Sequence, residues 1–341
     1  MIRNAMNVLI CPLNWGLGHA SRCVPIIRLL QKSGHNVIIA ADKGPLSFLQ
    51  KEFPELEFIR FPGFEPEYSR RDSQVWKFIS MMPRALLSFR REHQVLKRIM
   101  RYYSIDLIIS DNRFSCWNSK VKSIYITHQL HIRMPKFWHW ASFIINGMHR
   151  MYMCHYDEIW VPDVEDEKAS LAGSLSHPPV GGKTRYIGLK SRFDSNVGAM
   201  EDEKRDVLWL AVMSGPEPQR TMFENLVIEK AKKIQGRVVV LRGLPDSSEE
   251  PANMPSNVTV FNYVNDEMFV SLVKRSEVII CRSGYTALMD LAALNRKAFL
   301  VPTPGQTEQE YLAEYLSDKG FRWCRQKDFL DVEIIFKKKF F

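Results

Sequence analysis

The chain alternates short apolar runs with helical patterns, and it does so in two successive series, which constrains its fold more than any other feature. The first series opens with an apolar run at 8–12, a glycine-containing turn and a helical pattern over 20–33. Strands that alternate with helices favour right-handed βαβ units and parallel sheets. We therefore predict an α/β protein with two doubly wound domains. Further strands are predicted at 37–41, 58–61, 105–110, 123–127, 158–161, 207–213, 238–241, 258–261, 278–281 and 298–301, and further helices at 219–234, at 285–294 and from 308.

Two polar stretches separate the two series. Residues 163–186 are rich in Gly, Ser, Pro and charge and show no periodicity, and residues 191–206 are polar as well. Such composition is typical of loops and linkers. We place the boundary so that an N-terminal domain covers residues 1–186 and a C-terminal domain covers residues 187–341.

Composition narrows the class of protein. A hydrophobic content of 45% with 25% charged residues is globular and excludes a disordered chain or a coiled coil. The six cysteines form no C-x-x-C pair, so a zinc ribbon or a redox pair is not expected. No apolar run reaches the roughly 18–20 residues of a membrane span, and we expect a cytoplasmic protein. The net charge of +9 favours anionic partners, but the basic residues form no nucleic-acid motif, so no nucleic acid is expected.

The loop after the first strand carries the first candidate site. Gly16 and Gly18 precede His19 between a strand and a helix N-terminus, where backbone N–H groups favour negative charge. One interpretation is a partial dinucleotide fingerprint, with Asp42 closing the second strand. A second makes His19 a base that takes a proton from a hydroxyl near neutral pH. In a third, His19 only caps or packs the helix.

The second candidate site lies at 278–294, where a strand runs into a small-residue turn that opens a helix. Ser283, Gly284, Tyr285 and Thr286 present backbone N–H groups and hydroxyls at the helix N-terminus, which suits a phosphate. Asp290 lies one helical turn past Thr286 on the same face, where a carboxylate accepts both hydroxyls of a ribose. A phosphate site and a ribose acceptor on one helix predict a nucleotide site.

This stretch resembles the C-terminal domain of family 28 glycosyltransferases. The likeness is close over 278–316, which includes Phe299-Leu-Val-Pro302 and Gln306 through Tyr311, and loose elsewhere. In pattern the chain is most similar to the lipid-linked N-acetylglucosaminyltransferases of bacterial peptidoglycan synthesis. The resemblance implies the GT-B fold, in which two Rossmann-like domains face each other across a cleft and the C-terminal domain holds a UDP-sugar.

Roles follow from the resemblance position by position. Asp290 becomes the ribose ligand, where the family more often has Glu, and His19 matches the family's histidine. Arg192 falls in a segment that lacks the Asn and Pro of the family's G-N-P-x-R. The implied acceptor loop holds Gly16 and Gly18. The implied donor-binding residues are Arg192, Ser214, Gly215, Arg282, Ser283, Gly284, Tyr285, Thr286, Asp290, Gln306 and Gln309.

These residues predict an inverting, metal-independent transfer of a hexose or N-acetylhexosamine to a hydroxyl acceptor, with the lipid-linked acceptors of the family as the model. His19 is the expected base, and Asp111 either orients it or caps a helix. The acidic runs at 164–167 and 201–203 are predicted to be solvated loops, so no metal or other cofactor is expected. The alternatives are a sugar-nucleotide 2-epimerase or hydrolase of the same fold and a non-catalytic sugar-nucleotide or phospholipid-binding protein.

Three stretches combine apolar and basic side chains, at 75–103, 134–153 and 337–341. Such faces suit the surface of an anionic bilayer, and we expect association with the inner face of the membrane. The competing interpretation is core packing with a charged outer face.

Overall fold

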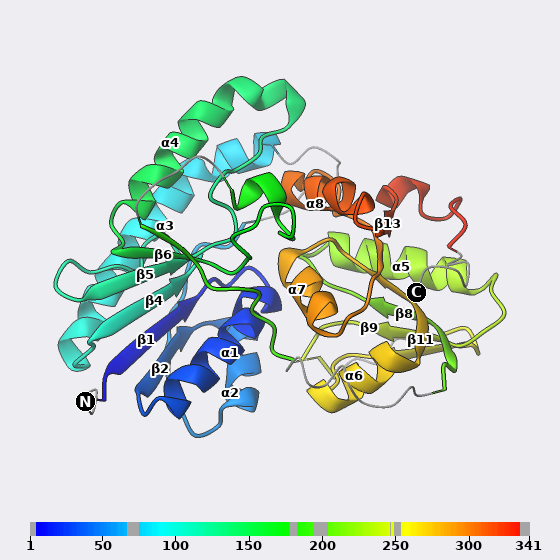
Figure 1. The fold of residues 1–341 in the computed structure, drawn as a ribbon, viewed down its shortest axis with the longest axis horizontal. Coiled ribbons are helices and arrows are strands. Elements are labelled where there is room, and N and C mark those ends of the chain that lie inside the picture. The colour runs from blue at the N-terminus through cyan, green and yellow to red at the C-terminus, as the bar shows by residue number, and fades with distance from the viewer. Residues whose placement is uncertain are drawn as a thin grey trace. The chain divides into compact units, whose positions relative to one another are not determined.

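The computed structural model describes residues 5–66, 75–177, 183–193, 204–245, 247–248 and 254–334. The chain divides into two compact units, Met1–Glu67 with Val75–Arg192 and Tyr68–Gln74 with Phe193–Phe341, here the N-terminal and C-terminal units. Each unit is an α/β domain with a parallel sheet, so the predicted fold class is confirmed (Figure 1). The division after Arg192 lies within the polar region that separates the two series.

The N-terminal unit is built on a seven-stranded sheet in the order β3-β2-β1-β4-β5-β6-β7, and every neighbouring pair is parallel. The two central strands are buried almost throughout, as expected for a sheet covered on both faces. The strands are β1 (Asn7–Pro12), β2 (Asn36–Ala41), β3 (Glu57–Arg60), β4 (Leu107–Asp111), β5 (Lys122–Ile126), β6 (Glu158–Val161) and β7 (Thr184–Tyr186). The α-helices are α1 (Leu17–Lys32), α2 (Lys43–Glu52), α3 (Val75–Tyr102) and α4 (Ser142–Met153), and α4 follows a short 3₁₀ helix, η1 (Lys136–Ala141).

The described residues of the polar stretch 163–186 belong to the N-terminal unit, which corrects the interpretation of this stretch as a linker. It ends in β7, the edge strand that pairs with β6. Asp163 is fully buried and accepts hydrogen bonds from the hydroxyls of Ser170 at 2.6 Å and Ser176 at 2.9 Å. Buried hydrogen bonds help to hold this segment, and its buried apolar residues, Ala172 and Leu175, do not recur at a regular spacing, so hydrophobic periodicity could not predict it.

The C-terminal unit has a six-stranded sheet in the order β10-β9-β8-β11-β12-β13, also parallel throughout. Its strands are β8 (Val207–Val212), β9 (Val238–Leu241), β10 (Val258–Phe261), β11 (Ser276–Cys281), β12 (Phe299–Leu300) and β13 (Arg322–Trp323). Its α-helices are α5 (Gln219–Ala231), α6 (Asp266–Arg275), α7 (Tyr285–Ala293) and α8 (Thr307–Ser317). Neither α6 nor β13 was predicted from the sequence. The start of α6 is fixed by Asn265, whose side chain accepts from the Met268 backbone N–H at 2.9 Å.

Both sheets contain a topological switch point at their centre. β1 lies between β2 and β4, and β8 lies between β9 and β11, so in each unit the chain leaves the central pair of strands in opposite directions. In open α/β sheets ligands bind in the crevice outside the carboxyl ends of such strands. The loops after β1 and β4, and those after β8 and β11, are therefore where each unit is expected to hold its functional residues.

Candidate active site

His19 and Asp111 meet at the switch point of the N-terminal unit. His19 lies in the first turn of α1, and Asp111 is the last residue of β4. His19 Nδ1 lies 2.7 Å from Asp111 Oδ1. The imidazole remains 18% exposed, whereas the carboxylate has no exposed surface. The predicted pairing of these two residues is thus present in the structure.

Arg22 completes this group, and the sequence analysis did not single it out. It lies three residues after His19 on α1 and donates to both oxygens of Asp111 through Nε and Nη2. Its Nη1 lies 3.2 Å from Nδ1 of His128, which follows β5. Burial alone would raise the pKa of Asp111, but the charge and hydrogen bonds of Arg22, aided by His19, hold it at about 2. The carboxylate is therefore ionised at neutral pH.

An ionised Asp111 favours one tautomer of His19. Nδ1 of His19 has two polar neighbours, Asp111 Oδ1 at 2.7 Å, which only accepts, and Arg22 Nη2 at 2.9 Å, which only donates. The shorter contact with the carboxylate favours the tautomer in which Nδ1 carries the hydrogen and Nε2 the lone pair. Burial, together with the nearby positive charge of Arg22, lowers the pKa of His19 against the opposing effect of Asp111. The imidazole is consequently neutral near pH 7, with Nε2 as its basic atom. This state is the one that a general base requires.

The two glycines of the predicted acceptor loop, Gly16 and Gly18, lie on either side of the start of α1. Gly16 is the residue before α1 and has φ of +105°, a conformation that side chains other than glycine rarely adopt. Gly18 already lies within α1, because the helix begins at Leu17 rather than at 20 as predicted. No side chain caps this helix N-terminus, and His19 donates to Asp111 instead of capping it.

The structure does not favour the dinucleotide interpretation of this loop. Asp42, the residue expected at the ribose, is 4% exposed and its Oδ1 accepts from Arg60 Nε at 2.9 Å. Its carboxylate is therefore already engaged within the unit.

In the C-terminal unit, the start of α7 provides a group of backbone donors. Gly284 is the residue before the helix and provides no side-chain cap, and the N-terminus of a helix favours a bound anion. Thr286 and Asp290 are half-buried on one face of α7, while Tyr285 is buried. Across the switch point, Ser214 and Gly215 follow β8 and are exposed, and Gly215 has φ of +96°.

The structure places Arg282 inside the C-terminal unit, which corrects its expected contact with phosphate. Its side chain has no exposed surface and donates through Nη1 to the carbonyls of Val301 and Pro302, at 3.0 and 3.2 Å. Its Nη2 donates to the Gln219 carbonyl at 2.8 Å and to Gln326 Oε1 at 2.6 Å. Burial lowers its pKa to about 9. Arg282 therefore stabilises the loops next to the N-terminus of α7 through buried hydrogen bonds and does not face a ligand.

A chain of hydrogen bonds lies behind the N-terminus of α7 and links Ser283, Gln309 and Thr303. The hydroxyl of Ser283 donates to the Gln309 carbonyl at 2.7 Å, so it also points into the unit and not toward a ligand. Gln309 Oε1 accepts from the Thr303 N–H at 2.9 Å. Oγ1 of Thr303 is buried and has no hydrogen-bond partner among the described residues, and a Cβ at Gly215 would lie 3.7 Å from it. Thr303 was missed because a lone threonine after a two-residue strand has no distinguishing pattern.

Two other predicted donor residues belong to elements other than α7. Gln306 is the residue before α8 and is half-buried. Arg192 belongs to the N-terminal unit, where its guanidinium lies 5.6 Å from the centre of the Phe48 ring.

A cluster of exposed apolar side chains lies on η1 and α4, and we call it the α4 patch. Its members are Trp140 at 68% exposure, Phe143 at 87%, Ile144 at 54% and Met151 at 57%. α4 contacts α3 through Tyr152 and Phe89, whose rings are 6.0 Å apart. Several basic side chains of α3 are exposed, namely Arg84, Arg90, Arg91, Lys97, Arg98 and Arg101. The tail 337–341 and the side chains of Trp76 and Phe78 lie outside what the structure describes.

The described residues contain neither a candidate membrane span nor a candidate metal centre. No helix there is long and apolar enough to cross a membrane. No group of three or more His, Cys, Asp or Glu residues there is arranged to hold a metal ion.

Comparison with known proteins confirms the resemblance inferred from sequence. Residues 210–338 match the glycosyltransferase family 28 C-terminal domain. A UDP-N-acetylglucosamine–N-acetylmuramyl-(pentapeptide) pyrophosphoryl-undecaprenol N-acetylglucosamine transferase of Desulforudis audaxviator is 37% identical over 71 residues, which is 20% of this chain and 18% of the relative. A glycosyltransferase of Methanopyrus kandleri described as uncharacterized is 22% identical over 304 residues, covering 86% of this chain and 84% of the relative.

Solved structures share the fold of the whole chain. The spinosyn rhamnosyltransferase SpnG superimposes with a TM-score of 0.63 at 16% identity, over 96% of this chain and 90% of SpnG. The MurG protein of Acinetobacter baumannii superimposes with a TM-score of 0.51 at 12% identity, over 94% and 86%. The fold is therefore GT-B, most of the C-terminal unit matches the family 28 C-terminal domain, and the prediction of a glycosyltransferase is confirmed.

Proposed function

We propose that this family 28-type glycosyltransferase moves a hexose or an N-acetylhexosamine from a nucleotide diphosphate sugar, with UDP as the nucleotide, to a hydroxyl acceptor. The transfer is direct, inverts the anomeric carbon and needs no metal ion. The observation that carries this proposal is the pairing of His19 with an ionised Asp111 at the switch point of the N-terminal unit. A neutral imidazole with its lone pair on Nε2 is suited to deprotonate a hydroxyl.

The geometry supports a single displacement. Asp111 has no exposed surface, and Arg22 and His19 already engage its oxygens, so it orients the base and cannot attack the sugar. Proton removal by His19 makes the acceptor oxygen the nucleophile, and the nucleoside diphosphate departs from the opposite face of the anomeric carbon. One displacement inverts the configuration at that carbon.

The C-terminal unit offers hydrogen-bond donors for the departing diphosphate. Negative charge develops on its oxygens as the bond to the sugar breaks, and the uncapped N-terminus of α7 offers preorganised backbone donors. Asp290 on the same helix is suited to accept from the ribose hydroxyls. These neutral donors are the basis for proposing that no metal ion is required.

Replacing Asp290 with alanine is expected to abolish the thermal stabilisation that UDP gives the protein. A ligand at 100 times its Kd stabilises a folded protein by about 2.7 kcal/mol, which corresponds to several degrees in Tm. The measurement is a thermal-shift series with UDP, GDP, dTDP, NAD and the corresponding sugar nucleotides.

The matched control is Asp318→Ala, an exposed aspartate after the end of α8. It should keep the full UDP shift. A shift with NAD alone, or a UDP shift that survives in Asp290→Ala, would contradict the donor site.

We also propose that the α4 patch touches an anionic membrane surface, where a lipid-linked acceptor resides. Exposed aromatic and aliphatic side chains favour the bilayer interface, and the exposed arginines of α3 favour anionic headgroups. The double variant Phe143→Glu with Ile144→Glu is expected to weaken binding to vesicles of phosphatidylcholine and phosphatidylglycerol by at least about tenfold, since it removes two buried apolar contacts and adds two like charges.

Vesicle co-sedimentation measures this effect. Leu29→Glu is the control, because Leu29 is 62% exposed on α1 of the same unit but lies outside the α4 patch. Equal loss in the control and the double variant, or equal binding to purely zwitterionic vesicles, would show that this patch is not the membrane contact.

A further inference from the structure

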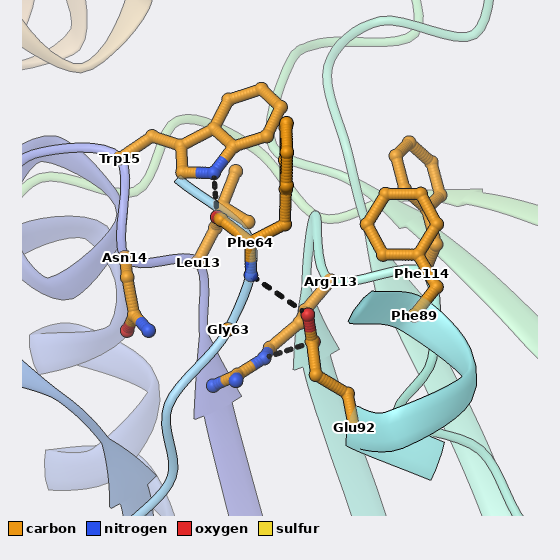
Figure 2. A pocket seen from close by; sticks show the side chains of 9 residues that line it. All are labelled: Leu13, Asn14, Trp15, Gly63, Phe64, Phe89, Glu92, Arg113 and Phe114. Atoms are coloured by element: carbon orange, nitrogen blue, oxygen red, sulfur yellow. Dashed lines mark hydrogen bonds and ion pairs between the residues drawn. The ribbon is translucent and has the colours of Figure 1, made fainter. Parts of the chain in front are cut away.

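The N-terminal unit contains a small pocket that none of the roles above uses, and we call it the Asn14 pocket. It lies beside the loop that joins β1 to α1, and Figure 2 shows the residues that line it. Three of its lining residues are polar and more than nine-tenths buried, and four others are aromatic. The lining residues are Leu13, Asn14, Trp15, Gly63, Phe64, Phe89, Glu92, Arg113 and Phe114.

Arg113 is held firmly, yet one of its nitrogens is left unused. The side chain is 2% exposed, and its Nε donates to Glu92 Oε2 at 2.9 Å. Its Nη2 donates to the carbonyls of Phe61 at 2.9 Å and Pro62 at 2.8 Å. Nη1 has no hydrogen-bond partner within the described parts of the chain. A buried donor of this kind is costly unless something accepts from it.

Asn14 presents the complementary group. Its side-chain nitrogen lies 3.5 Å from the same Phe61 carbonyl that Arg113 contacts, so the two side chains approach one another. Its Oδ1 is buried and, like Nη1 of Arg113, lacks a partner among the described residues. The pocket thus offers one unused donor and one unused acceptor. A hydroxyl group suits such a lining, because a hydroxyl oxygen can accept from a nitrogen donor and a hydroxyl hydrogen can be donated to an oxygen acceptor.

The charge and size of the pocket restrict the ligand further. Glu92 accepts from Arg113 and from the Phe64 N–H at 2.9 Å, so the guanidinium is already balanced and a neutral group is favoured over an anion. The free space holds about one water-sized group. A Cβ at Gly63 would lie 2.7 Å from Nη2 of Arg113, so the backbone closes one side. The aromatic side chains of the pocket suit contact with the apolar face of a sugar ring or with another apolar part of the ligand.

The pocket lies at the same edge of the sheet as the proposed base. Asn14 and Trp15 are in the loop that leads to His19, and Arg113 is two residues past Asp111. We propose that the Asn14 pocket holds a neutral hydroxyl group of the acceptor, other than the hydroxyl that attacks, and so fixes how the acceptor is presented to His19. This inference rests on the proposed glycosyl transfer.

The test is a binding measurement on the full chain with octyl β-D-glucoside below its critical micelle concentration. The indole N–H of Trp15 donates to the Phe64 carbonyl at 2.6 Å, beside the pocket, so its ¹H–¹⁵N NMR signal reports local binding. Trp15→Phe assigns that signal. A saturable shift with the glucoside is expected, with no shift from inorganic phosphate at the same concentration.

Asn14→Leu should weaken the glucoside affinity about three- to tenfold, the loss that one hydrogen bond accounts for. The matched control, Asn36→Leu, alters an exposed asparagine at the start of β2 and should leave the affinity unchanged. Gly63→Ala forces the Arg113 guanidinium to move and should weaken binding as well. Three results would overturn the proposal. They are an unchanged glucoside affinity in Asn14→Leu, a signal shift caused by phosphate, and no signal shift with either probe. The last result would mean that only water occupies the pocket.

Donor binding is measured on the same samples by the thermal shift with UDP. If that shift is absent while the glucoside still binds in the Asn14 pocket, the proposed transfer fails and the pocket remains a hydroxyl site. If UDP binds normally while the glucoside does not bind, the pocket assignment alone fails.

Discussion

Replacing His19 with alanine is expected to lower the rate of sugar transfer by about 10²–10⁴-fold, the usual contribution of a general base. The variant loses the lone pair on Nε2 that takes the proton from the acceptor hydroxyl. Release of UDP from a UDP-hexose or a UDP-N-acetylhexosamine, with a hydroxyl acceptor present and EDTA in excess, measures the effect. The unmodified protein should remain active under these conditions, since the proposed reaction uses no metal ion.

Three further measurements separate a base from a structural residue. UDP should still raise the Tm of His19→Ala, because the donor site lies in the other unit. Added imidazole should restore part of the lost rate. The control His35→Ala, which alters a histidine before β2, should transfer sugar normally. A variant with an unchanged rate, or with a low rate together with a lost UDP shift, would contradict the role of His19.

The pH dependence of the unmodified protein follows from the same group. The pKa of His19 is lowered from its ordinary value of 6.5, chiefly by burial and then by the charge of Arg22. Protonated His19 cannot act as a base, so kcat/KM should fall as the pH drops through this lowered pKa. The acid limb is therefore expected below pH 6.5 and should be missing in His19→Ala.

The sequence predicted the βα alternation and the pairing of His19 with Asp111 because both depend on local patterns. Apolar runs mark buried parallel strands, and a residue that ends a central strand must lie at the carboxyl edge of the sheet. The His19 prediction also needed the family resemblance, since a histidine in a glycine loop has several uses.

Arg22 and Arg282 show what sequence patterns do not predict. Arg22 looks like a solvated residue of an amphipathic helix, yet it is buried against Asp111, which is remote in sequence. Arg282 directly precedes the turn that opens α7, but its side chain points into the unit. There it donates to carbonyl oxygens of three segments, near 301, 219 and 326. In both cases long-range contacts decide where a long side chain points, and no local rule contains them.

Asp111→Asn is expected to destabilise the N-terminal unit by about 3–5 kcal/mol at pH 7, because it leaves the buried charge of Arg22 without its carboxylate partner. The pKa of Asp111 is about 2 in the folded protein and lies below its ordinary value of 3.8. A lowered pKa contributes stability above the unfolded value and loses it as the pH falls through the folded value. The difference in the free energy of unfolding between the variant and the unmodified protein should therefore become smaller as the pH falls from about 4 to about 2.

Hydrogen exchange of the β1 and β4 amides measures this loss in the N-terminal unit itself, since two units can unfold separately. Asp106→Asn is the matched control, because Asp106 precedes the same strand and its exposed carboxylate accepts from the Asn7 N–H at 2.8 Å. That control should lose no more than about 1 kcal/mol, the worth of one hydrogen bond. Equal losses in the two variants, or a difference that stays constant below pH 4, would show that Asp111 and Arg22 are not the charge pair that supports His19.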